Sequence, residues 1–390
     1  MLRLTRLKVC LFVNLLSLAD FAPTDSAAWL AMCNRKIKPG NDSSYAIFHC
    51  NVPQGGHMLF SDIRSWASIH SKGMFGVSIV CEIGGRISLP WPFKANNLVS
   101  LEVRFCALDD FLSEMTYSNI TQIPDYLRNL VISDVSIHVG VRDLHDTVQN
   151  IENITRDADC GQLTLHRMVF RNIHFNRKTT ESELDVHLYG HNSTDESDFV
   201  AADSLVHHCS YNNLTSLDES GSRSMGKYHL RLLTETSMFP RLEEYILRNN
   251  NFSHVPHKLQ TWTHNFPNLR VLDLSENELV AFEFDLVTVA QGLFNTKYRL
   301  IDLRKNKIGS VSIEGAMNLQ RIGDIIVDLR ENPLYCNCRL ADFRRYLQEM
   351  YEKYQDEHTR QLLSDIKCSL PFNLRNSSVL DSSLDHFFNC

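Results

Sequence analysis

The sequence lacks the features that mark a membrane-spanning or nucleic-acid-binding protein. No apolar run reaches the ~18 residues that a transmembrane helix needs, so we expect no membrane span. The chain has 39 Lys and Arg against 46 Asp and Glu, and its formal net charge of -7 does not provide the basic surface of a nucleic-acid binder. Of its 390 residues 43% are hydrophobic, which excludes a wholly disordered chain.

The motifs of common enzymes are missing as well. The sequence contains no G-x-S-x-G elbow and no G-x-G-x-x-G loop. Gly221 to Lys227 has the spacing of a phosphate loop, but Tyr228 stands where the motif needs Ser or Thr. His187 and His191 have the spacing of a zinc-binding helix without the Glu of H-E-x-x-H. We therefore expect no enzyme, no cofactor and no metal site.

The N-terminus has the layout of a secretory signal peptide. Three basic residues among the first eight precede an apolar run from Val9 to Ala19, and Ser17 and Ala19 supply the small residues of a cleavage site. Ser26 and Ala28 offer a second cleavage site. Removal of residues 1–19 takes away three basic residues and no acid, which leaves 36 basic against 46 acidic residues, or -10. We expect a secreted, extracellular protein.

Secretion changes how the cysteines and asparagines are interpreted. Cys10 leaves with the signal peptide, and the even set of ten that remains suggests disulfides in an oxidising compartment. Seven Asn-x-Ser/Thr sequons are predicted glycosylation sites. They are Asn41, Asn119, Asn153, Asn192, Asn213, Asn251 and Asn376.

A repeat organises the middle of the chain. The template L-x-x-L-x-L-x-x-N/C-x-L is met most cleanly by Leu269, Leu272, Leu274, Asn277, Leu279 and Phe282. Further copies begin at Leu98, Leu242 and Tyr298, and the last runs from Val327 to Leu334. Successive asparagines in the last four copies are 27, 29 and 26 residues apart, which lies within the range of leucine-rich repeats.

The copies between residues 127 and 235 are weaker. Val135 replaces the Asn in the copy from Leu127 to Ile137, and Leu163 to Phe170 fits loosely. Asn212, Leu214 and Leu217 indicate the second half of a copy whose strand would contain His207 and Cys209. Amphipathic helices remain the alternative for residues 160–235.

The template has a physical basis. Its L-x-L core forms a short strand whose alternate side chains point inward, and each repeat buries its leucines against the next. The Asn amide faces inward where the chain leaves the strand, and can bond backbone groups of neighbouring turns. The sequence therefore predicts an α/β fold, a curved leucine-rich-repeat solenoid with disulfide-stapled caps at both ends.

Cysteines mark both ends of the solenoid. We divide the chain into a signal peptide (1–19), an N-terminal cap (20–97), repeats (98–334, degenerate over 160–235) and a C-terminal cap (335–390). Apolar residues at helical spacing between Leu340 and Tyr354 predict a covering helix. We expect Cys336 to pair with Cys368 and Cys338 with Cys390. Among three possible pairings at the front, the most local joins Cys33 to Cys50 and Cys81 to Cys106. Cys160 and Cys209 either pair or lie buried separately.

One surface pattern recurs in the late repeats. Acids occupy the outward strand position, and arginines follow two residues on, with Ser275 interrupting the series. These columns on the concave face are either a solvated face with cross-strand ion pairs or part of a partner-binding surface. The candidate ligand-facing residues are Asp273, Asp302, Asp328, Arg248, Arg304 and Arg330.

Both flanks resemble the ectodomain of insect Toll receptors. The run "LRVLDLSENELVAFEFDLV…YRLIDLRKNKIGSV…GDIIVDLRENPLYCNC" is similar to the final repeats and first C-terminal flank of Toll. The four front cysteines, with "VSIVC" and "LEVRFC", resemble its N-terminal flank, and the centre matches only as degenerate repeats. The resemblance implies a curved extracellular solenoid that binds a protein ligand, which for Toll is the cystine-knot cytokine Spätzle.

The chain departs from Toll in several ways. It has fewer repeats, no second cysteine-flanked block, no membrane helix and no TIR domain, and it stops at Cys390. No ligand-contacting residue can be matched one by one. We expect a secreted binding protein for an extracellular protein ligand, and the resemblance suggests a soluble modulator in insect development or immunity. A matrix or cell-adhesion component is the alternative. The negative charge of the mature chain favours a basic protein partner over nucleic acid.

Overall fold

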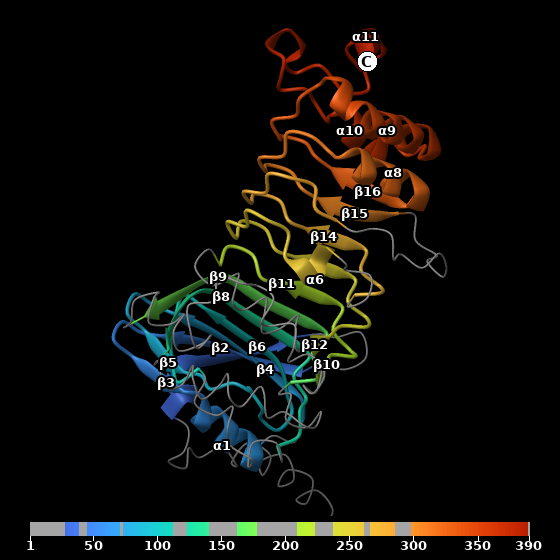
Figure 1. Cartoon of the computed structure of the whole chain (residues 1–390). Coiled ribbons are helices and arrows are strands. Elements are labelled where there is room, and N and C mark those ends of the chain that lie inside the picture. The colour runs from blue at the N-terminus through green and yellow to red at the C-terminus, as the bar shows by residue number, and fades with distance from the viewer. Residues whose placement is uncertain are drawn as a thin grey trace, which may run out of the picture.

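The structure, a computed structural model, shows a curved stack of repeats with its N-terminal end at the bottom and its C-terminal cap at the top of Figure 1. The predicted signal peptide, the histidines His187, His191 and His207, and the sequons at Asn41, Asn119, Asn153 and Asn192 lie outside the described residues. The structure describes residues 28–38, 45–70, 73–111, 123–139, 162–177, 209–222, 237–260, 266–284 and 298–388.

One long sheet runs through the whole stack. Its strands follow one another in the order β1-β2-β4-β6-β8-β9-β11-β13-β14-β15-β16, and every neighbouring pair is parallel except the β1–β2 hairpin. Parallel neighbours need a crossover between them, and here each repeat supplies one. The strands are β1 Cys33–Lys38, β2 Tyr45–Val52, β4 Phe75–Cys81, β6 Leu98–Arg104, β8 Asn129–Val139, β9 Arg167–Arg177, β11 Ser216–Asp218, β13 Glu244–Ile246, β14 Val271–Asp273, β15 Arg299–Asp302 and β16 Ile325–Asp328.

The N-terminal half carries a second strand in each turn. β3 (His57–Leu59) pairs with β5 (Arg86–Ser88), β5 pairs with β7 (Ala107–Asp109), and β7 pairs with the second half of β8. β8 and β9 are long because each spans both strand positions. Parallel pairing therefore starts at β2 and β4, inside the segment that the sequence assigns to the cap, and the domain bounds stay a prediction.

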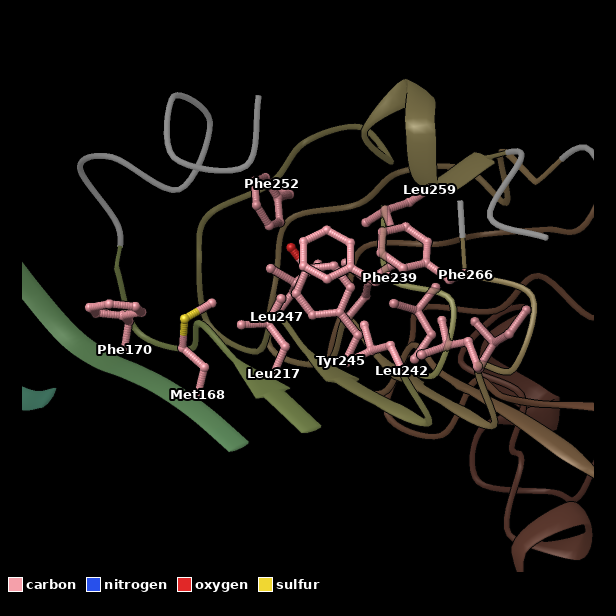
Figure 2. Packing of buried hydrophobic residues seen from close by; sticks show 14 of the residues in the cluster. Met168, Phe170, Leu217, Phe239, Leu242, Tyr245, Leu247, Phe252, Leu259 and Phe266 are labelled. Atoms are coloured by element: carbon pink, nitrogen blue, oxygen red, sulfur yellow. The ribbon is translucent and has the colours of Figure 1, made fainter. Parts of the chain in front are cut away.

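The core is a continuous apolar stack on the inner side of the sheet. Met168, Leu217 and Tyr245 stand in register on neighbouring strands and project into the same interior (Figure 2). On the far side, the rings of Tyr211, Phe239 and Phe266 stack with centroid separations of 5.3 and 5.6 Å. Tyr211 follows the short strand β10 (Cys209–Ser210), which pairs with β12 (Ser237–Met238) outside the main sheet. The chain is an α/β leucine-rich-repeat solenoid, as the sequence predicts.

Buried asparagines tie successive turns together. Asn277 Oδ1 accepts from the backbone N–H groups of Asn250 (2.9 Å) and Phe252 (3.1 Å). Its Nδ2 donates to the carbonyls of Leu247 (3.0 Å) and Leu274 (2.9 Å). Each amide thus satisfies main-chain groups of its own turn and of the preceding one, which would otherwise be orphaned in the apolar core. Equivalent bonds are made by Asn250, Asn306 and Asn332.

The residue before the asparagine position has a left-handed backbone in eight successive turns. The φ values lie between 53° and 74°. Gly221 is the one glycine in the series, and a Cβ there would lie 1.9 Å from Asn172 Oδ1. The other positions are non-glycine residues held in a sparsely populated region by the packing around them. The series is Phe105, Asp134, Asn172, Gly221, Asn249, Glu276, Lys305 and Glu331.

The predicted register of the degenerate copy near residue 214 is wrong. Leu217 lies within the strand β11, whereas Cys209 lies in β10. By its spacing from Leu214 and Leu217, Glu219 occupies the third leucine position of the template. It is buried and accepts a hydrogen bond from the Tyr245 hydroxyl at 2.7 Å. The helical alternative for residues 160–235 is also wrong wherever the structure describes that region, since β9, β10 and β11 are strands.

The N-terminal cap combines disulfides with an aromatic cluster. Cys33 is bonded to Cys50 and Cys81 to Cys106, so one bridge closes the β1–β2 hairpin and the other joins the last residue of β4 to Cys106, two residues after the end of β6. Four aromatic rings meet edge to face at centroid separations of 5.3 to 6.1 Å beside helix α1 (Phe60–His70). They are Trp29, Phe48, Trp66 and Phe75, and Trp29 belongs to the short helix η1 (Ala28–Met32).

The C-terminal cap is helical. Cys336 is bonded to Cys368, and Cys338 is also disulfide-bonded, although its predicted partner Cys390 lies outside the described residues. Cys209 is disulfide-bonded as well, and Cys160 lies outside the described residues. The remaining helices are α6 His257–Gln260, α8 Ile313–Ile322, η4 Cys338–Leu340, α9 Ala341–Lys353, α10 Glu357–Ser364, η5 Phe372–Leu374, η6 Ser382–Leu384 and α11 Asp385–Phe388. Within the described part of the chain, none of the helices has the length and apolar character of a membrane span.

Candidate binding surface

The concave face of the sheet carries a row in which arginine and serine alternate as far as Arg304, and Arg330 follows in the next turn. Val80 pairs with Arg104, Arg104 with Ser133, and Ser133 with Arg171. Beyond Arg171, the backbone N–H of each left-handed residue donates to the carbonyl of the row member in the next turn, which continues the register. From Arg104 onward the arginine–serine row is Arg104, Ser133, Arg171, Ser220, Arg248, Ser275, Arg304 and Arg330.

The alternation of long arginine and short serine side chains leaves room for each arginine between closely spaced strands. Adjacent strands lie about 4.8 Å apart, so arginines on every second strand are about 10 Å apart. Ser133, Ser220 and Ser275 are buried between them. The side chains of Arg104 and Arg248 remain about half exposed. A line of guanidinium groups therefore follows the concave face, on every second strand up to Arg304 and on the next strand at Arg330.

The acids of the late repeats lie beneath this row. Asp302 is only 5% exposed and Asp328 only 1%. Arg304 Nε lies 2.9 and 3.0 Å from the two Asp302 oxygens and 3.4 Å from Asp328 Oδ2, so it covers both carboxylates. A ligand on this face would meet guanidinium groups before it met Asp302 or Asp328. Asp273, the third predicted acid, is half-buried.

The remaining arginines are held in a similar way. Arg330 binds Asp328 through Nε and Nη2, with Nη2 at 2.7 Å from Oδ2. Arg171 pairs with the buried Asp218 on the neighbouring strand β11, and Arg104 pairs with Glu102. Sequence reasoning missed these early members of the pattern. The signal was available, because each arginine directly follows the second apolar residue of an L-x-L core, as Arg171 follows Phe170.

Arg248 is held by Glu276, a partly exposed acid, and not by a buried one. It bonds Glu276 at 2.6 Å, and Lys305 bonds the same carboxylate at 3.0 Å. Hydrogen bonds from these two cations lower the pKa of Glu276 to about 2. Arg248 can therefore be replaced without leaving a deeply buried carboxylate unpaired.

Burial changes the pKa of the acids beneath the row in the opposite direction. It raises the pKa of Asp328, and the negative charge of Asp302 adds to this, while hydrogen bonds from Arg330 oppose it. Burial likewise raises the pKa of Asp273. In the described residues, no group of three His, Cys, Asp or Glu is placed to hold a metal ion. The chemistry that this surface offers is hydrogen-bond donation by fixed cations.

Three of the seven sequons fall on described residues. Asn251 and Asn376 are exposed, and Asn213 is partly buried, with its Nδ2 3.5 Å from the Leu163 carbonyl. None of these three belongs to the arginine–serine row.

The fold and surface can be compared with known proteins. No protein-family model and no curated protein matches this sequence. Among solved structures, human 5T4 (Wnt-activated inhibitory factor 1, trophoblast glycoprotein) is 16% identical, with 88% of this chain and 94% of that chain covered and a TM-score of 0.44. The mouse RP105/MD-1 complex is 16% identical, with 78% of this chain and 45% of that chain covered and a TM-score of 0.40. The fold class therefore rests on the repeats and the sheet of this chain itself.

Proposed function

We propose that the protein is a secreted binding protein that takes an extracellular protein ligand along the arginine–serine row. The observation that supports this most is the fixed line of five partly exposed arginines. Arginine is enriched at the energetic centres of protein interfaces, and side chains already held in place lose less entropy on binding. Each guanidinium has five N–H donors, so those not used by the acids beneath remain for ligand carboxylates and carbonyls.

Charge at longer range selects the partner. The mature chain would carry a net charge of -10, which attracts a ligand that is basic overall and repels acidic ones. Acceptor groups on such a ligand would then dock on the arginines at short range. On the resemblance of both flanks to Toll, we propose a cystine-knot cytokine as this ligand and soluble modulation of its signalling in insect development or immunity as the role. A matrix or cell-adhesion role is the second candidate.

Binding of a recombinant cystine-knot cytokine to the secreted full chain tests the proposal. Arg104→Ser and Arg248→Ser suit this test, because their partners Glu102 and Glu276 are partly exposed and neither change leaves a deeply buried carboxylate unpaired. We expect the double variant to raise Kd at least ~10-fold, since interface arginines are commonly worth more than ~1 kcal/mol each. Arg345→Ser on α9, an arginine that is 60% exposed and does not belong to the row, should leave Kd unchanged.

Three results would contradict parts of this proposal. Retention of the protein inside cells removes the secretory assignment. Recovery from culture only with matrix or cell surfaces favours the adhesion role. Equal binding by the double variant and the Arg345→Ser control shows that the ligand docks elsewhere.

A further inference from the structure

A hairpin in the C-terminal cap exposes an aromatic ring beside a sequon. Cys368 N–H donates to the Ser377 carbonyl and Asn376 N–H donates to the Cys368 carbonyl, both at 2.9 Å. The disulfide from Cys368 to Cys336 fixes the base of this hairpin to the last repeat. The loop between these pairs is therefore held on a rigid base.

Phe372 begins the short helix η5 within this loop and is 78% exposed. Leu374, two residues further, is buried, so the loop already has its own apolar anchor and does not need the Phe372 ring for packing. The backbone N–H of Arg375 donates to the Phe372 carbonyl at 3.2 Å, which turns the chain back on itself. This turn brings Asn376 into the neighbourhood of Phe372.

Asn376 is presented for modification. It is exposed, it heads the sequon Asn376-Ser377-Ser378, and its φ of 70° is one that asparagine tolerates better than most residues. Its backbone is held by the bond to Cys368, so the direction in which its side chain leaves the loop is fixed.

We propose that Asn376 carries an N-linked glycan whose first sugar packs on the ring of Phe372. The proposal rests on the secretory route of the proposed function. Asn376 Nδ2 bonds to C1 of the first sugar of a polyprenyl-diphosphate-linked oligosaccharide, the C1–O bond to the diphosphate breaks, the diphosphate leaves with the electron pair, and the amide loses one proton. One face of a pyranose presents C–H groups, which suit the negative face of an aromatic ring. The sugar then covers apolar surface that would otherwise face water.

A double-mutant cycle on the secreted full chain tests this. The four proteins are wild type, Phe372→Ala, Asn376→Asp and the double variant. Asp is chosen at position 376 because it tolerates the left-handed backbone. We expect Phe372→Ala to lower Tm by about 1–3 °C when the glycan is present and by less than about 0.5 °C when it is absent. The rate at which an amidase releases the glycan from folded protein should rise at least two-fold in Phe372→Ala.

Phe372→Tyr and Ile313→Ala provide controls. Phe372→Tyr keeps an aromatic face and should retain the wild-type release rate. Ile313 is 60% exposed on α8 and belongs to no sequon. Ile313→Ala should change Tm equally in the wild-type protein and in the Asn376→Asp variant.

Peptide mass spectrometry separates the possible failures. An unmodified Asn376 in a protein that is glycosylated at Asn251 overturns this inference alone. Absence of glycan at every sequon contradicts the proposed secretory route as well. Equal effects of Phe372→Ala with and without the glycan show that the ring and the sugar do not interact.

Discussion

Tyr346 on helix α9 donates its phenolic hydrogen to the main-chain carbonyl of Ile325 in β16 at 2.6 Å. The same oxygen accepts from the Val327 N–H at 3.3 Å. Within the described residues β16 is the last strand of the sheet, and such an edge presents backbone groups that can pair with other chains. The cap helix therefore covers the leucine core and also satisfies the edge of the sheet.

Tyr346→Phe should lower the free energy of unfolding by about 1–3 kcal/mol. The change keeps the ring and leaves the buried carbonyl of Ile325 without its partner. Denaturant unfolding followed by circular dichroism measures this. Tyr351→Phe on the same helix, where the ring is partly exposed, is the matched control and should change stability by less than about 0.5 kcal/mol. Equal effects of the two substitutions would show that the hydroxyl of Tyr346 has no special role.

Asn277→Ala should cost ~3 kcal/mol or more, because it leaves two buried N–H groups and two buried carbonyls without the amide. Asn277→Asp separates the two halves of this effect. It keeps an acceptor for Asn250 and Phe252, but it places a charge against the Leu247 and Leu274 carbonyls. Both variants should unfold at lower denaturant concentration than Asn373→Ala on the exposed C-terminal hairpin. A wild-type midpoint for Asn277→Ala would contradict the role assigned to the asparagine.

Tyr245→Phe should destabilise the protein by about 1–3 kcal/mol, since the buried Glu219 carboxylate loses the hydroxyl at 2.7 Å. Burial, and then the charge of Glu219, raises the pKa of Tyr245 well above its ordinary value. Adding Glu219→Leu, the residue that the template favours, should recover part of that loss. Simple additivity of the two substitutions would show that the pair is not coupled.

Glu276→Gln should lower the free energy of unfolding by at most about 1 kcal/mol at pH 7, since the ion pairs of Glu276 with Arg248 and Lys305 are partly exposed. Pairing lowers the pKa of Glu276 from 4.5 to about 2. The stabilisation is therefore complete above pH 4.5 and is lost as the pH falls towards 2. Thermal unfolding of both proteins from pH 7 to pH 2 should show converging Tm values. A gap that persists at pH 2 would mean that the substitution acts through packing.

The sequence was most informative where the asparagine series is complete. The copies with Asn250, Asn277, Asn306 and Asn332 align in the structure as the template predicts, because the inward amide admits few substitutes. The copy at Leu217 was misplaced, because Glu219 stands at a leucine position and is stabilised by Tyr245 from the next turn. A partner that lies 26 residues away cannot be read from a local pattern.

The binding surface shows the same limit. Strand periodicity predicts that Asp302 and Asp328 lie on the concave side of the sheet. It could not show that Arg304 and Arg330 fold back over them, because that depends on side chains from stacked strands. Arg104 and Arg171 were missed for another reason, since they lie outside the late repeats to which the predicted columns were confined.

A left-handed residue follows the first strand position in each of these turns, so repeats of different length can share the same backbone turn. Successive members of the series are separated by as few as 26 residues and, between Asn172 and Gly221, by 49. Turns of different length therefore keep their strands paired in one sheet, as β9 and β11 do. A chain that lacks residues 277–305 would join Glu276 directly to Asn306 with the same backbone turn that Lys305 makes now. Whole turns could then be removed or added to tune the reach of the concave face while both caps are kept.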